Sequence, residues 1–179
     1  MNAELPKDAK RNGVRIRWWQ PHHSGQSLGD WAIDDIVVGG NAINPSEVKD
    51  DFNAGRRESV WLQSSNSRLG DYCGSESAVV GEAIDKENVV LTTTDVAVLD
   101  DYILQFGISV GCNASWESDL APVHLQYSTD YGMTWRHLVH ECLPYHPECN
   151  GFADTWSVYY ASAGWRRITI PLRGPAIST

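Results

Sequence analysis

The chain has 179 residues, a length that suits one ordinary domain, and its 42% hydrophobic residues with eight Trp supply material for a core. Its formal net charge is −9 and it has no basic stripe, which argues against nucleic acid or an anionic membrane as a partner. No stretch reaches the about 18 apolar residues of a membrane helix, and residues 1–13 lack the apolar region of a signal peptide.

Short segments with strand character follow one another along the chain, without a long helical periodicity between them. The first alternates Val14, Ile16 and Trp18 with two arginines, so we expect a half-buried strand. In chain order, the predicted strands are 14–19, 31–40, 60–64, 87–96, 102–111, 123–128, 134–141, 156–161 and 165–172. Clusters of Gly, Pro, Asn and Asp separate them, and such a series predicts an all-β protein, an antiparallel β-sandwich or jelly roll.

Alternation within 102–111 also assigns its faces. Leu104, Phe106, Ile108 and Val110 form the set that should face the core. The tryptophans at 18, 19, 31 and 61 are expected in the core as well, with an exposed carbohydrate platform as the alternative.

The stretch STDYGMTW, residues 128–135, lies between two predicted strands and has the composition of a hairpin turn. Gly132 can adopt a positive φ, Asp130 can accept hydrogen bonds from backbone N–H groups, and Trp135 can pack across the base. Ser128 and Thr134 complete a set in which each residue type has a structural task. We therefore interpret the stretch as a turn and not as an active site.

The cysteines indicate disulfides and not a zinc site, because no CxxC pair is present. We expect Cys73 to pair with Cys112 and Cys142 with Cys149, although four cysteines permit three connectivities. Asn113 begins a glycosylation sequon directly after Cys112. Disulfides and a sequon both favour an extracellular compartment.

Signals for catalysis or transition metals are weak. The order His137-x-x-His140-Glu141 is not that of a zinc protease, and a strand would point the two imidazoles to opposite faces. His22-His23 lies in a polar loop, and no Ser elbow of the G-x-S-x-G type is present. Glu117 and Asp119 could suggest a glycosidase, but nothing in the sequence sets their separation. We predict no catalytic residues and no designed zinc site.

The spacing of Ser128, Asp130, Gly132, Thr134 and Trp135 resembles the Asp-box, or BNR repeat, of sialidases and other extracellular β proteins. In that group the box is a folding motif away from the catalytic centre, and a sialidase carries several of them. With its flanks added, the chain resembles reelin repeats over nearly its whole length. The segments that carry this resemblance are 15–40, the Asp50-Asp51-Phe52 segment, YCG at 72–74, 111–144 and 156–172.

The resemblance implies that each repeat contains two jelly-roll subrepeats around an EGF-like module, for which this chain has no cysteine cluster. Here the closing segment of a subrepeat comes first and the opening segment follows. We interpret residues 1–40 as the closing strands of a preceding subrepeat, and 41–179 as a subrepeat that lacks its own last strands. The N-terminal strands should fill the vacant positions by permuted closure, within one chain or by exchange between two, since unpaired edges would otherwise be exposed.

The resemblance further implies a secreted, non-catalytic glycoprotein module of the extracellular matrix, with roles in cell adhesion, signalling and neuronal migration. Its expected partners are a receptor of the lipoprotein-receptor type or neighbouring repeats. It also implies calcium, for which the candidate ligands are Asp34, Asp35, Asp50 and Asp51.

Two other classes of function stay open at this stage. A secreted carbohydrate-binding module predicts an exposed Trp beside polar groups. A sialidase-like glycosidase predicts converging arginines, whereas Arg56-Arg57 and Arg166-Arg167 are adjacent pairs that should point apart on strands.

Overall fold

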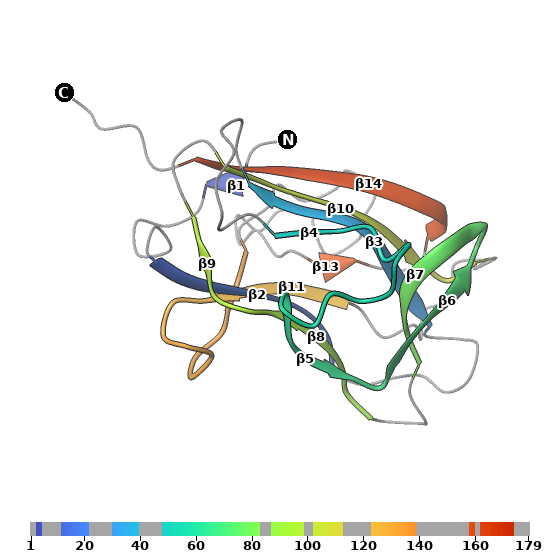
Figure 1. Ribbon diagram of the computed structural model, residues 1–179, viewed down its shortest axis with the longest axis horizontal. Helices are drawn as coiled ribbons and strands as arrows, with labels where there is room; N and C mark the ends of the chain where they lie inside the picture. The colour runs from blue at the N-terminus through green and yellow to red at the C-terminus, as the bar shows by residue number, and fades with distance from the viewer. Residues whose placement is uncertain are drawn as a thin grey trace, which may run out of the picture.

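The structure is a computed structural model, and it describes residues 3–4, 12–21, 30–39, 48–82, 87–98, 102–112, 123–138, 158–159 and 162–173. In these ranges the regular elements are all β-strands, and they form two sheets that lie one above the other (Figure 1). The predicted all-β sandwich is confirmed. No helix in the described ranges has the length and apolar character needed to cross a membrane.

The strands are between 2 and 12 residues long. They are β1 Ala3–Glu4, β2 Asn12–Gln20, β3 Trp31–Gly39, β4 Val48–Asp50, β5 Trp61–Ser65, β6 Ser67–Tyr72, β7 Ser75–Gly81, β8 Val89–Thr93, β9 Val96–Ala97, β10 Tyr102–Val110, β11 Val123–Ser128, β12 Arg136–His137, β13 Val158–Tyr159 and β14 Ser162–Arg173.

The first sheet has the strand order β1-β14-β10-β3-β7-β6, and β4 also pairs with β3. The second has the order β12-β11-β2-β8-β5, with β13 also paired to β11 and β9 to β2. All of these pairings are antiparallel except the short contact between β1 and β14.

Strands β2 and β3, which come early in the sequence, complete the two sheets within one chain. In the second sheet β2 lies between β11 and β8, where Trp18 pairs with Leu125 on one side and Leu91 on the other. In the first sheet β3 lies between β10 and β7, where Ile33 pairs with Ile108 and Val79. The predicted closure by these strands is confirmed. The assignment of residues 1–40 to a preceding subrepeat stays a prediction.

The core lies between the sheets and follows the predicted alternation. Val14, Ile16 and Trp18 are at most 2% exposed, and Trp18 meets Phe106 edge-on with ring centroids 5.2 Å apart. Leu104, Phe106, Ile108 and Val110 are all buried, as predicted. Trp31 and Trp61 are also buried, but Trp19 is only half-buried because it lies on the outer face of the second sheet, opposite His124.

The hairpin of β6 and β7 was not among the predicted strands. Its polar sequence lacks a clear alternation, and pairing between β7 and β3 supplies the context that a local pattern could not show. The predicted strand 87–96 is divided into β8 and β9. At this break the Thr94 N–H donates to the Val60 carbonyl instead of continuing the ladder. Residues 139–141 of another predicted strand lie outside the described ranges.

Candidate functional site

A β-bulge in β3 turns one aspartate out of the first sheet. Gln105 of β10 pairs with Val37, but Gly107 pairs with Asp34, so β3 carries one extra residue between these two pairs. Asp35, at φ 52°, has a left-handed backbone that Asp tolerates better than most residues. As a result Asp35 is exposed, while the next residue, Ile36, is fully buried in the core.

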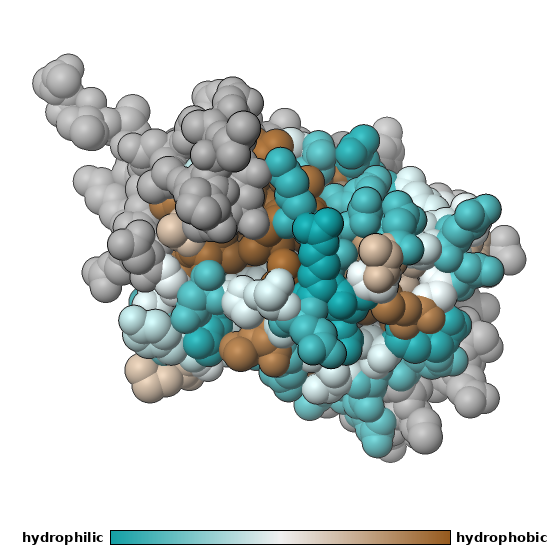
Figure 2. Space-filling model, in the orientation of Figure 1, coloured by the Kyte–Doolittle hydropathy of each residue, from teal (hydrophilic) through white to brown (hydrophobic). Residues whose placement is uncertain are grey.

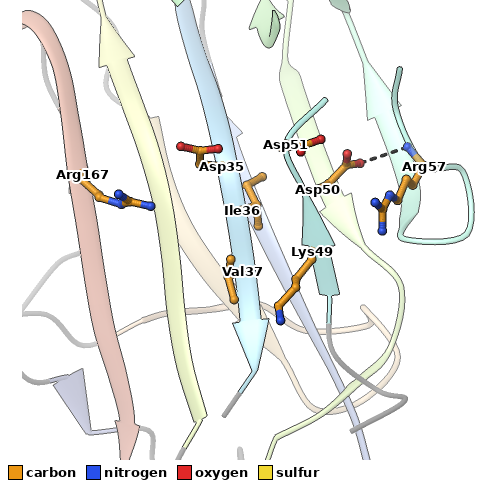
Figure 3. A pocket seen from close by; sticks show the side chains of 8 residues that line it. All are labelled: Asp35, Ile36, Val37, Lys49, Asp50, Asp51, Arg57 and Arg167. Atoms are coloured by element: carbon orange, nitrogen blue, oxygen red, sulfur yellow. Dashed lines mark hydrogen bonds between the residues drawn. The ribbon is translucent and has the colours of Figure 1, made fainter. Parts of the chain in front are cut away.

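Two cavities lie beside this bulge, and both are lined by Asp35 and Arg167. The first, of about 330 Å³, lies along β3 and β4 and is shown in Figure 3. Its lining residues are Asp35, Ile36, Val37, Lys49, Asp50, Asp51, Arg57 and Arg167. The second, of about 290 Å³, lies between the β6–β7 turn and β14, and its lining residues are Asp34, Asp35, Gly74, Ser75, Gly107, Trp165, Arg166 and Arg167.

Asp50 is a structural carboxylate at the edge of the first cavity. It is 2% exposed, and both of its oxygens accept hydrogen bonds. Oδ1 accepts from the Phe52 N–H at 3.1 Å, and Oδ2 accepts from the Arg57 N–H at 3.0 Å and from the indole Nε1 of Trp61 at 2.7 Å. Asp50 therefore fixes the loop that carries Arg57 against the core.

Both oxygens of Asp34 also accept hydrogen bonds. Its Oδ2 accepts from the Ser75 hydroxyl at 2.8 Å, and its Oδ1 accepts from the Asp35 N–H at 2.7 Å. Burial raises the pKa of Asp34 despite these bonds, and the charges of Asp35 and Asp51 add to the effect. Asp35 and Asp51 are thus close enough to Asp34 for their charges to act on it.

The predicted calcium ligands divide into two pairs when tested against this geometry. Asp34 and Asp50 do not fit as free ligands, because their oxygens already hold the backbone and nearby side chains. Asp35 and Asp51 do fit, since the pairing of Ile36 with Asp50 brings the adjacent carboxylates to one level of the sheet (Figure 3). No group of three or more His, Cys, Asp or Glu side chains in the described ranges is placed to hold a metal ion. Calcium needs six to eight oxygens, so the calcium site stays a prediction in which Asp35 and Asp51 supply only some of the ligands.

Trp165 forms one wall of the second cavity. The Trp165 ring lies beside Gly107 of β10, where a Cβ atom would be 3.4 Å from it. The indole Nε1 donates to the Tyr72 carbonyl at 3.1 Å, and the Tyr72 hydroxyl donates to the Asp30 carbonyl at 2.6 Å. Trp165 and Tyr72 pack on a small apolar cluster of Ala32, Ala78 and Val80 outside the main core.

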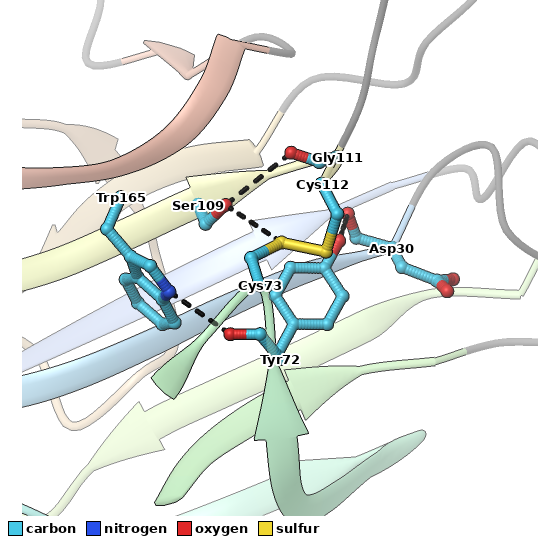
Figure 4. The surroundings of a disulfide bond; sticks show 7 residues. All are labelled: Asp30, Tyr72, Cys73, Ser109, Gly111, Cys112 and Trp165. Carbon is cyan, nitrogen blue, oxygen red and sulfur yellow. Dashed lines mark hydrogen bonds between the residues drawn. A yellow bond between two sulfur atoms is a disulfide. The ribbon is translucent and has the colours of Figure 1, made fainter. Parts of the chain in front are cut away.

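A disulfide between Cys73 and Cys112 fixes the β6–β7 turn beside this wall (Figure 4). This confirms the predicted first pairing. Cys142, Cys149 and the sequon at Asn113 lie outside the described residues, as do His22-His23, His140, Glu117 and Asp119.

Residues 128–135 form a turn with a dense local frame. Asp130 accepts from the Thr134 N–H at 2.9 Å and the Thr134 hydroxyl at 2.5 Å, and from the Ser128 hydroxyl at 2.7 Å. These bonds, led by the Thr134 hydroxyl, lower the pKa of Asp130 to about 2. Ser128 also accepts from the Gly132 N–H at 2.8 Å. The guanidinium of Arg17 lies 4.1 Å from the centroid of the Trp135 ring, so the base of the turn rests on β2.

Several residues of the cavities were missed from the sequence because they come from distant strands. Arg166 and Arg167 both line the second cavity, and they pair with buried Ile108 and with Gly107 in unbroken register, so the expectation that their side chains point apart on the strand stays a prediction. A register shift in β14 and the positive φ of Gly164 lie just before them. Of the other pair, Arg57 lines the first cavity and Arg56 lines neither. The sequence offered one signal for these cavity residues. Basic side chains lie near paired acidic residues in a chain that is acidic as a whole.

A comparison with protein families shows to which family the chain belongs. The family model described as Reelin subrepeat B matches residues 1–39 and 66–179, which is most of the chain. The chain belongs to the reelin subrepeat B family. Reelin repeats are typically extracellular, non-enzymatic modules that take part in protein–protein interactions. No solved structure gives a significant match. Residues 40–65 lie between the matched segments, so Lys49, Asp51 and Arg57 of the first cavity come from outside them.

Proposed function

We propose that this reelin-type module is a non-catalytic part of a secreted matrix or signalling glycoprotein and that it binds a protein partner at the first cavity. The observation that carries the proposal is the mixture of charges on one rigid surface. Asp35, Lys49, Asp51, Arg57 and Arg167 line the same cavity, and all five are exposed. Charges of both signs at fixed positions favour a partner with the opposite pattern, which gives specificity and fast association.

The cavity is built on strands and an anchored loop, which supports recognition by a preformed surface. Asp35 is fixed by the bulge between β3 and β10, and Arg57 lies in a loop anchored by buried Asp50. The face shown in Figure 2 mixes hydrophilic residues with several apolar patches. Such a surface suits a reversible contact with another extracellular protein better than a permanent apolar interface.

The partner class follows from the family. We propose a receptor of the lipoprotein-receptor type or a neighbouring repeat of the same glycoprotein, in a process such as neuronal positioning. Surface plasmon resonance with each candidate ectodomain immobilised tests the proposal. Arg57→Gln should weaken binding about tenfold by removing one charge-assisted contact, and Arg56→Gln, outside both cavities, should not.

Two outcomes of this experiment would overturn the proposal. One is the absence of binding to both ectodomains by the parent chain at micromolar concentration. The other is equal affinity of the parent chain, Arg57→Gln and Arg56→Gln, because the first cavity would then make no contact with the partner.

We also propose that Asp35 and Asp51 contribute to a calcium site at this cavity. Both carboxylates are exposed and line the first cavity, where Asp35 lies in β3 and Asp51 directly follows the adjacent β4, so two negative charges face a cation there. An ion that binds only the folded state raises the melting temperature. We expect millimolar calcium to raise it for the parent chain and for Asp71→Asn, but not for the double variant Asp35→Asn, Asp51→Asn. An unchanged melting temperature of the parent chain would refute the site.

A further inference from the structure

The second cavity has a composition different from that of the first. It combines an indole, two guanidinium groups, a hydroxyl and two carboxylates around a glycine of β10. We infer that this cavity binds an acidic sugar, a pyranose ring that carries a carboxylate. The inference concerns a ligand class separate from the protein partner proposed above, at a site to which Arg166 and Trp165 contribute and Arg57 does not.

Trp165 supplies the apolar surface that a sugar ring requires. Its Nε1 is already bonded to the Tyr72 carbonyl, and one side of the ring lies over Gly107. The indole is therefore held in one orientation, yet it is only half-buried and lines the cavity. The C–H groups of a pyranose pack against such an aromatic surface, and a fixed ring loses little conformational entropy on binding.

Arg166 and Arg167 supply the groups that select an acid. Both are exposed, and Arg167 makes one long contact, 3.3 Å from its Nη2 to the Gln105 amide oxygen, on the side of β10. Guanidinium groups bind carboxylates through paired N–H donors. In a chain with a net charge of −9, these two cations balance the charges of Asp34 and Asp35 at this cavity and supply donors for an anionic group.

Asp35 and Ser75 supply polar groups for the hydroxyls of a sugar. Asp34 and Ser75 are joined at 2.8 Å, and Asp35 projects from the bulge between the two cavities. Carboxylate and hydroxyl oxygens accept hydrogen bonds from sugar hydroxyls. A volume of about 290 Å³ lies at the lower end of small-ligand sites, so the cavity suits one ring of a longer glycan.

Two natural sources carry this chemistry, a uronic acid of a matrix polysaccharide and a terminal sialic acid. Ligand-observed NMR on the full chain separates them, with a hyaluronan oligosaccharide in one arm and sialyllactose in the other. Carboxyl-reduced hyaluronan and lactose are the matched neutral probes. We expect binding in one acidic arm, no binding of its neutral counterpart, and at least a tenfold loss in Arg166→Gln. Arg56→Gln should bind as the parent chain does.

The same variants distinguish this inference from the proposed protein contact. Arg57→Gln should leave sugar binding unchanged, whereas Arg166→Gln should leave the protein contact unchanged. The inference is overturned if neither acidic oligosaccharide binds at millimolar concentration or if the neutral probe binds equally. Undiminished binding by Arg166→Gln overturns it as well, and so does the finding that only an acidic peptide binds at this cavity. Trp165→Phe, which keeps an aromatic ring, provides a second variant if Arg166→Gln is poorly folded.

Discussion

The turn at 128–135 and the bulge at Asp34–Asp35 contain the same kind of unusual backbone, but different parts of the chain hold it in place. Each holds a non-glycine residue at positive φ, Tyr131 at 59° and Asp35 at 52°, beside an aspartate that accepts hydrogen bonds. The side-chain partners of Asp130 lie within four residues of it. The hydroxyl that bonds Asp34 belongs to Ser75, 41 residues away.

We call the turn a local frame, because residues near in the sequence hold it. We call the bulge and its cavities an assembled frame, because residues from distant parts of the chain hold them. The turn carries its own donors and acceptors, so its shape depends mainly on its own sequence. The two cavities depend on β4, β10, β14 and the β6–β7 turn coming together. Substitutions of distant anchors should therefore damage the cavities and spare the turn, and the predictions below test that contrast.

The largest effect is expected from the disulfide that holds the β6–β7 turn. Replacing Cys73 and Cys112 by Ala opens a loop that spans 39 residues and should lower the free energy of unfolding by about 4 kcal/mol. Urea denaturation measures this loss, and the amide NMR shift of Thr134 reports on the turn. A loss below about 1 kcal/mol, or a Thr134 shift that moves with the loss of the bridge, would contradict the contrast.

A substitution of Asp50 tests the same contrast at the first cavity. Asp50→Ala leaves three donors near the core without their acceptor, the N–H groups of Phe52 and Arg57 and the indole of Trp61. We expect a loss of about 3 kcal/mol in the free energy of unfolding. Asp51→Ala is the matched control, because the exposed Asp51 accepts a single hydrogen bond within the described residues, from the Asn53 N–H at 3.3 Å, and it should change stability by about 0.5 kcal/mol or less. Similar losses for the two variants would show that Asp50 has no special structural role.

The sequence predicted those parts of the structure in which neighbours in the chain are also partners in space. Alternation gave the inward face of β10, and residues 128–135 showed the composition of the turn. The order of the segments led to the closure by β2 and β3, because unpaired edges are unfavourable. The cavities were beyond such reasoning. The bulge at Asp35 and the irregularity just before Arg166 are register shifts between strands that no local pattern specifies.

The face beneath the turn should respond to acid. The rings of Trp135, Trp19, His124 and His137 form a continuous series of contacts, with the Arg17 guanidinium between the two indoles. Burial lowers the pKa of His124 to about 4, and the charges of His137 and Arg17 act in the same direction. A folded-state pKa below the ordinary 6.5 means that the unfolded chain binds more protons between these values, so stability falls as the pH drops from about 6.5 to 4.

Unfolding measured at several pH values tests this effect. We expect a loss of about 1 kcal/mol over that range, after allowing for the solvent that still reaches the ring. His124→Gln should flatten this part of the profile, because the amide does not titrate. An identical slope in the variant would assign the acid response to other groups, and the series of ring contacts would then have no part in it.

The smallest effect concerns the strain in the turn itself. Tyr131 is 66% exposed, and its carbonyl accepts from the Arg15 guanidinium, a bond that does not need the phenol ring. Asn adopts a positive φ more readily than Tyr, so Tyr131→Asn should raise the free energy of unfolding by about 0.5 kcal/mol. Chemical denaturation of the parent and variant chains measures the difference. A decrease would mean that the contact of the Arg15 guanidinium with the Tyr131 ring, at 5.8 Å from the centroid, outweighs the strain. The turn would then depend on β2 as the cavities depend on their distant strands, and the contrast between a local and an assembled frame would fail at its simplest point.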